Sequence, residues 1–143
     1  MPRDFGHLIM TDQAFTTAAV SENTMNLGAA DKNMGNAVIY AHVTVKVAAG
    51  GLDSGGRIHV VDSAAAALTA DRALATFTST TCSDDGVIPV GDLTAGTHLI
   101  CALPPGIKLK QYLGFAVVPV NEAATGLKLD GWFDLNAGEI DLQ

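Results

Sequence analysis

The chain has few charged, few aromatic and few basic side chains for its length of 143 residues. Charged residues make up 16% and aromatic residues 6%, and eight lysines and arginines stand against 15 acidic residues. Nucleic-acid binding needs clustered basic residues that pair with phosphates, so a net charge of −7 argues against that partner. No apolar run approaches the roughly 20 residues that cross a bilayer, so we expect no membrane-spanning segment.

Cysteine is also scarce, which excludes a disulfide-stapled scaffold. Only Cys82 and Cys101 are present, and one possible bridge is not a disulfide framework. Cys101 lies within an apolar run and is predicted to be a small buried hydrophobic residue. Cys82 follows polar residues and is predicted to lie in a loop.

Motifs that carry chemistry are missing as well. The four histidines, His7, His42, His59 and His98, form no H-x-x-x-H pair, so the sequence predicts no metal site. His42 and His59 fall at outward positions of predicted strands and would be neighbours if those strands paired. There is no G-x-S-x-G elbow and no phosphate-binding loop. We therefore expect no catalytic residues and no cofactor, and we expect that the chain is not an enzyme.

Strands dominate what the sequence does contain. Residues 38–47 alternate strictly, with Ile39, Ala41 and Val43 on one face and polar residues on the other, which indicates a half-buried strand. Further strands are predicted at residues 57–62, 74–81, 87–90, 97–103, 112–120, 127–135 and 139–143. About eight short strands separated by turn residues predict an all-β, single-domain, jelly-roll-like β-sandwich.

The first residues show no such period. Phe5, Leu8, Ile9 and Phe15 are scattered among polar residues. Two interpretations remain open: an extended N-terminal arm at residues 1–20 preceding a sandwich at residues 21–143, or an ordinary first strand. In the arm interpretation, these four apolar side chains are candidate interface anchors.

Several segments together resemble one known family. They are residues 12–14 (DQA), 26–30 (NLGAA), 93–97 (LTAGT), 99–109 (LICALPPGIKL) and 112–113 (YL). This pattern resembles the jelly-roll capsid cement proteins, also called decoration proteins, of Bordetella-type short-tailed bacteriophages. The resemblance covers most of the chain and is strongest over residues 93–113.

The resemblance implies a structural component of the virion, made in the host cytoplasm, that binds the outer surface of the head. The implied partners are the major capsid protein and further copies of the chain, as a homodimer or alternatively a trimer. Tyr40 and Trp132 are candidate interface anchors, since tyrosine and tryptophan are enriched at binding hot spots.

Two other functions suit a sandwich. One is a carbohydrate-binding attachment module, which needs exposed aromatic rings and has only Trp132 and two tyrosines to offer. The other is a cupin-type enzyme, which needs clustered histidine and glutamate ligands that the sequence does not show. The sequence therefore favours the capsid protein.

Overall fold

A computed structural model of the chain describes residues 8–15, 19–27, 32–33, 39–48, 55–65, 68, 72–82, 86–104, 108–120 and 126–135. The strands are β1 (Leu8–Ala14), β2 (Ala19–Val20), β3 (Met25–Asn26), β4 (Lys32–Asn33), β5 (Ile39–Val47), β6 (Gly56–Ser63), β7 (Ala73–Thr76), β8 (His98–Ala102), β9 (Lys108–Leu109), β10 (Tyr112–Pro119) and β11 (Lys128–Leu135). A single 3₁₀ turn, η1 (Val90–Asp92), is the one helical element within these ranges.

The longest strands form where polar and apolar residues alternate. In β5, Ile39, Ala41, Val43 and Val45 are buried, while the residues between them are only partly covered. A strand that presents one side to the core and the other to solvent requires this period of two. The prediction of an all-β sandwich is confirmed.

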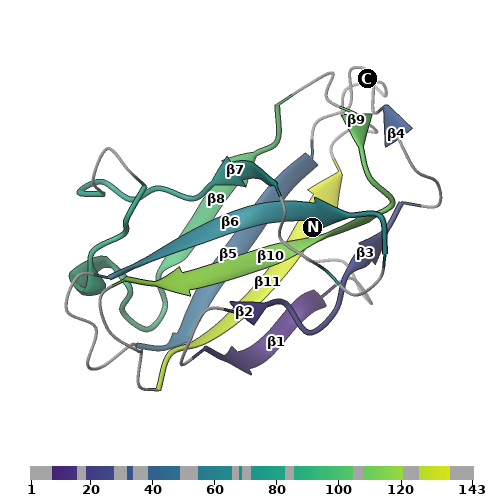
Figure 1. Cartoon of the computed structure of the whole chain (residues 1–143). Coiled ribbons are helices and arrows are strands. Elements are labelled where there is room, and N and C mark those ends of the chain that lie inside the picture. Colours follow the sequence, from purple (N-terminus) through teal and green to yellow (C-terminus); the bar gives the residue numbers. More distant parts are fainter. Residues whose placement is uncertain are drawn as a thin grey trace, which may run out of the picture.

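The strands pair in a jelly-roll order. Sheet A runs β1-β11-β5-β8, and sheet B runs β2-β10-β6-β7, with β3 also beside β10. In Figure 1 the two sheets lie one in front of the other. One antiparallel ribbon joins the first half of the chain to the second. It consists of the pairs β1·β11, β2·β10, β3·β10, β4·β9, β5·β8 and β6·β7. Folding this ribbon over adds β5·β11 and β6·β10, which gives the two sheets of a jelly roll.

Aromatic side chains fill the space between the sheets. Phe115 of sheet B stacks on Phe133 of sheet A, with ring centroids 4.6 Å apart and planes within 2°. The ring of Phe77 lies 6.0 Å from that of Phe115. At Gly131 in β11, an added Cβ would lie 2.5 Å from Met10 Cε and 2.9 Å from Phe115 Cε2, so any larger residue would have to displace these two side chains.

The N-terminal residues that the structure describes form strands of the sandwich and not a separate arm. β1 pairs with β11 at the edge of sheet A, and β2 pairs with β10 in sheet B. Ile9 and Phe15 are buried in the core of their own chain, which corrects their assignment as arm anchors. Leu8 opens β1 opposite Trp132, whereas Phe5 lies outside the described residues.

Two of the predicted strands are longer than the strands that the structure shows. The predicted strand at residues 74–81 is shorter in the structure, where β7 ends at Thr76. The predicted strand at residues 87–90 is only an isolated bridge between Ile88 and Gly56, followed directly by η1. Pro89 has no N–H to donate, so a ladder cannot continue through it. The strand predicted at residues 139–143 lies outside the described residues.

Ser21 completes the hydrogen bonding of β10 just beyond the end of β2. Its hydroxyl accepts a hydrogen bond from the Phe115 N–H at 3.1 Å and donates one to the Asn23 carbonyl at 2.8 Å. We expect Ser21→Ala to lower the free energy of unfolding by about 1–2 kcal/mol, because the buried N–H loses its acceptor. Urea denaturation measures this loss. Thr78 is exposed and provides the control, and Thr78→Ala should change stability by less than about 0.5 kcal/mol.

Candidate interaction surface

The outer face of sheet A carries a patch of ring-bearing and apolar side chains. Alternation in β5, β8 and β11 directs one set of residues away from the core. The set, called here the outer-face patch, comprises Tyr40, His42, His98, Ile100 and Trp132. Ile100 is 53% exposed and Val47 43%, and these are the two exposed large hydrophobic side chains among the described residues. Val47 lies at the far end of β5, outside the patch.

Three rings pack together at the centre of the patch. The His42 imidazole stacks on the Trp132 indole, with centroids 5.0 Å apart and planes within 2°. His98 lies against both rings, with its centroid 5.2 Å from that of His42 and 5.4 Å from that of Trp132. The strand register explains this, since His42 is directly opposite Trp132, and His98 of β8 is opposite the next outward residue, Thr44. Trp132 is only 8% exposed as a result.

Polar contacts join the rings to a carboxylate. His42 Nδ1 lies 3.1 Å from His98 Nε2, and His42 Nε2 lies 3.4 Å from Asp134 Oδ2. Burial lowers the pKa of His42 below its ordinary value; Asp134 opposes this shift, and the neighbouring His98 adds to it. The contribution of His42 to the free energy of unfolding is therefore complete above about pH 6.5. It is lost as the pH falls through the pKa of His42 in the folded state, which lies below 6.5.

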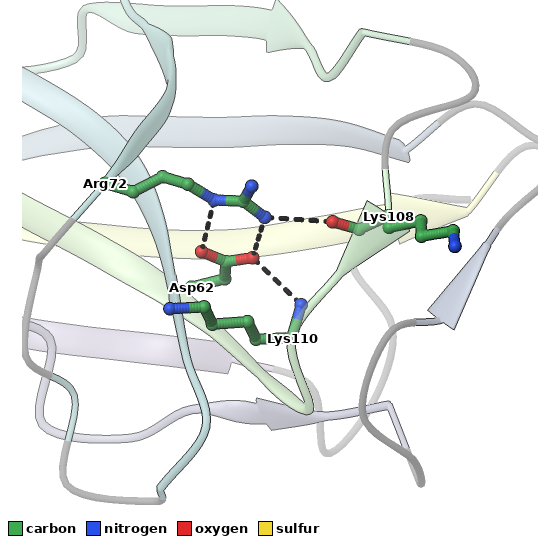
Figure 2. Close-up of polar contacts among 4 residues, drawn as sticks. All are labelled: Asp62, Arg72, Lys108 and Lys110. Atoms are coloured by element: carbon green, nitrogen blue, oxygen red, sulfur yellow. Dashed lines mark hydrogen bonds and ion pairs between the residues drawn. The ribbon is translucent and has the colours of Figure 1, made fainter.

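An ion pair with a buried carboxylate lies on the other sheet. Figure 2 shows the Asp62 carboxylate held by Arg72, whose Nε donates to Oδ1 at 3.1 Å and whose Nη2 donates to Oδ2 at 2.6 Å. The Lys110 N–H also donates to Oδ2 at 2.9 Å, and Arg72 Nη2 reaches the Lys108 carbonyl at 2.9 Å. Burial alone would raise the pKa of Asp62, but these donors and the positive charges outweigh it and hold the pKa below its usual value. These contacts join β6 to the segments that precede β7 and β10.

Comparison with known proteins places the chain in a family. The Bbp16 family model matches residues 9–134, which spans both sheets and the outer-face patch. The chain belongs to the Bbp16 family. The family name points to a protein of a Bordetella phage, in agreement with the phage origin that the sequence resemblance implied. No curated protein matches the chain.

The Bbp16-family match includes four of the six predicted anchor residues, and the structure separates them into two groups. Tyr40 and Trp132 lie on the same outer face, two registers of the β5–β11 pair apart. Ile9 and Phe15 are in the core, as described above.

The histidines are arranged differently from the prediction. His59 is on β6 in sheet B, where its Nδ1 lies 2.9 Å from Thr76 Oγ1, so it is not a neighbour of His42. The neighbour of His42 is instead His98, on the edge strand β8. Sequence reasoning missed this pair, although His98 does stand at an outward position, one residue before the buried Leu99. His7 lies outside the described residues.

The remaining reactive side chains offer little chemistry. Both cysteines are free, and burial raises the pKa of Cys101 to about 11, which keeps this thiol protonated and weakly nucleophilic near neutral pH. Within the described ranges, no three histidine, cysteine or acidic side chains come together in a way that could hold a metal ion. No helix in the described part of the chain is long and apolar enough to cross a bilayer.

Proposed function

We propose that the chain is a capsid cement protein that binds the outer surface of a phage head and stabilises contacts between major capsid subunits. The observation that carries the proposal is the Bbp16 family match over both sheets, taken with the resemblance to phage cement proteins. The proposed role is structural and not enzymatic. The partners are the major capsid protein and further copies of the chain, with a homodimer expected and a trimer as the alternative.

The jelly roll suits this role mechanically. The two sheets share one core, so the domain can transmit force between the capsid subunits that it touches. A shell presents the same binding patch many times. An oligomer that engages two or more subunits gains affinity by multivalency, even when each single contact is modest.

The outer-face patch is the surface that we propose to contact the head. It combines an exposed apolar side chain, Ile100, with the half-buried Tyr40, and tyrosine is enriched at binding hot spots. The outer face of sheet B is less suited, because part of it is already covered. Leu68 packs against Gly114 there, and Val61 and Ala116 are buried although they point away from the core.

The carbohydrate-binding alternative receives no comparable support from the patch. Sugar recognition by stacking needs an accessible ring face. His42 covers one face of the Trp132 indole in parallel, and the tryptophan is almost fully buried. Tyr40 and Tyr112 are both half-buried.

Co-sedimentation with expanded phage heads that lack cement protein tests the proposal. We expect the wild-type chain to saturate at a simple ratio to the major capsid subunit. Ile100→Asp should weaken binding by about tenfold or more, since a buried charge at an interface centre costs well over 1.4 kcal/mol. Val47→Asp is the matched control, because it places the same charge on an exposed apolar position of the same sheet outside the patch.

The possible outcomes separate the parts of the proposal. Absence of wild-type binding to heads would contradict the cement function and favour an attachment role, which a glycan screen would then examine. Equal binding of Ile100→Asp and Val47→Asp would leave the cement function standing but remove the outer-face patch as its contact surface.

A further inference from the structure

The contact between His42 and His98 limits how many protons the two rings can carry. A hydrogen bond between two ring nitrogens needs one donor and one acceptor, and the observed separation is 3.1 Å. His42 Nε2 faces the Asp134 carboxylate at 3.4 Å, which favours a proton on that nitrogen. His42 Nδ1 is then the acceptor, and His98 Nε2–H is the donor.

The geometry of the contact accommodates one added proton but not two. A proton on a ring nitrogen outside the contact leaves the hydrogen bond intact. A second added proton must go to His42 Nδ1. Both facing nitrogens would then be donors on two cationic rings, and the contact could not persist.

The surrounding groups do not remove this conflict. β11 contributes Asp134, which can balance one of the two positive charges, and Asp130, which lies 3.9 Å from Lys46 of β5. Tyr40 is the remaining ionisable side chain on this face of β5. On β8, the other outward residues beside His98 are Ile100 and Ala102, which carry no charge. The downward shift of the His42 pKa agrees with an environment that resists the second proton.

We propose that the His42–His98 contact is a proton-operated latch on the outer face of sheet A, which opens on double protonation and uncovers Trp132. His98 is the part that moves, because it is exposed on an edge strand, whereas His42 lies on a central strand between β8 and β11. The latch is a property of the isolated chain and does not depend on the proposed capsid role.

Trp132 reports on the latch directly, because it is the only tryptophan of the chain. Acrylamide quenching of its fluorescence would be followed from about pH 8 to about pH 4.5, roughly two units below the ordinary histidine pKa. Far-UV circular dichroism on the same samples monitors the fold. We expect quenching to increase with a midpoint below pH 6.5, with no change in the dichroism.

Two variants make the test specific. In His98→Gln, the side-chain amide can donate to or accept from His42 in either protonation state, so the increase in quenching should be lost. In the matched control His59→Gln, which changes a histidine of sheet B, the increase should remain. The proposal is overturned if quenching in the wild type does not rise, if the rise coincides with loss of the dichroism signal, or if His98→Gln shows the same rise.

Discussion

Phe115→Ala is expected to lower the free energy of unfolding by about 4 kcal/mol, the largest loss among the substitutions considered for this chain. Phe115 is fully buried, and its ring touches both sheets, since it stacks on Phe133 and approaches Phe77. Truncation removes these contacts and leaves a cavity. The strands around it cannot collapse freely, because β10 is fixed between β6 on one side and β2 and β3 on the other.

Urea denaturation measures the effect as a lower midpoint with an unchanged slope. With a slope of about 2 kcal/mol per molar, the midpoint should fall by about 2 M. Phe115→Leu keeps most of the volume and should lose clearly less. Ile100→Ala, at an exposed site, should stay within about 0.5 kcal/mol of the wild type. A loss for Phe115→Ala no greater than that for Ile100→Ala would show that the sheets do not pack around this ring.

The strands that could be predicted from the sequence are those with an unbroken period of two. In β11, the order of Leu129, Gly131 and Phe133 against Asp130 and Trp132 predicts both the strand and its inward face, and the structure confirms both. A strand that turns one face to the hydrophobic core needs this alternation, so a short segment of sequence is enough to recognise it.

The sequence could not distinguish an N-terminal strand from an extended arm, because the geometry of β1 interrupts the period of two. The pairing of β1 with β11 shifts register twice, between Leu8 and Met10 and again between Met10 and Gln13. Asp12 adopts a left-handed backbone with φ of 50°, and its N–H donates to Asp130 Oδ1 at 2.7 Å. Bulges of this kind place consecutive residues on the same face, so the apolar positions look scattered in the sequence.

Only part of the outer-face patch could be predicted, because local alternation gives the direction of a side chain but not its neighbours on other strands. The outward direction of Tyr40 and Trp132 follows from local alternation. The presence of His98 beside His42 does not, because it depends on the pairing of β5 with β8 across 56 residues of chain. The same limit applies to the ion pair in sheet B. Nothing local to Asp62 indicates that its partner is Arg72 or that the Lys110 N–H completes its shell.

Arg72→Met is expected to destabilise the chain by about 3 kcal/mol at neutral pH, because it leaves the Asp62 carboxylate buried without its counter-ion. The Asp62 side chain is fully buried, while that of Arg72 is 40% exposed. Solvent therefore screens part of the attraction, and the loss belongs at the lower end of the range for buried pairs. The Lys110 N–H remains, but one amide donor does not replace two guanidinium donors and a charge.

The pH dependence of this loss distinguishes a broken ion pair from lost packing. In the wild type, the pKa of Asp62 is lowered in the folded state, so its stabilising contribution is full above about pH 3.9 and is lost as the pH falls through the folded-state pKa. In Arg72→Met, burial dominates and the pKa should lie above 3.9. The contribution then has the opposite sign, being full below about pH 3.9 and lost as the pH rises through the new folded-state pKa. The difference between variant and wild type should thus shrink on going from about pH 7 towards about pH 4.

Two further variants complete the measurement. Asp62→Asn combined with Arg72→Met removes the buried charge and should recover part of the loss at neutral pH, because an uncharged amide is less costly to bury than an unpaired carboxylate. Lys128→Met removes a positive charge from β11 of the other sheet and should not produce a loss that shrinks towards acid pH in this way. A pH-independent loss in Arg72→Met, with no recovery in the double variant, would mean that Arg72 stabilises the fold by packing and not through Asp62.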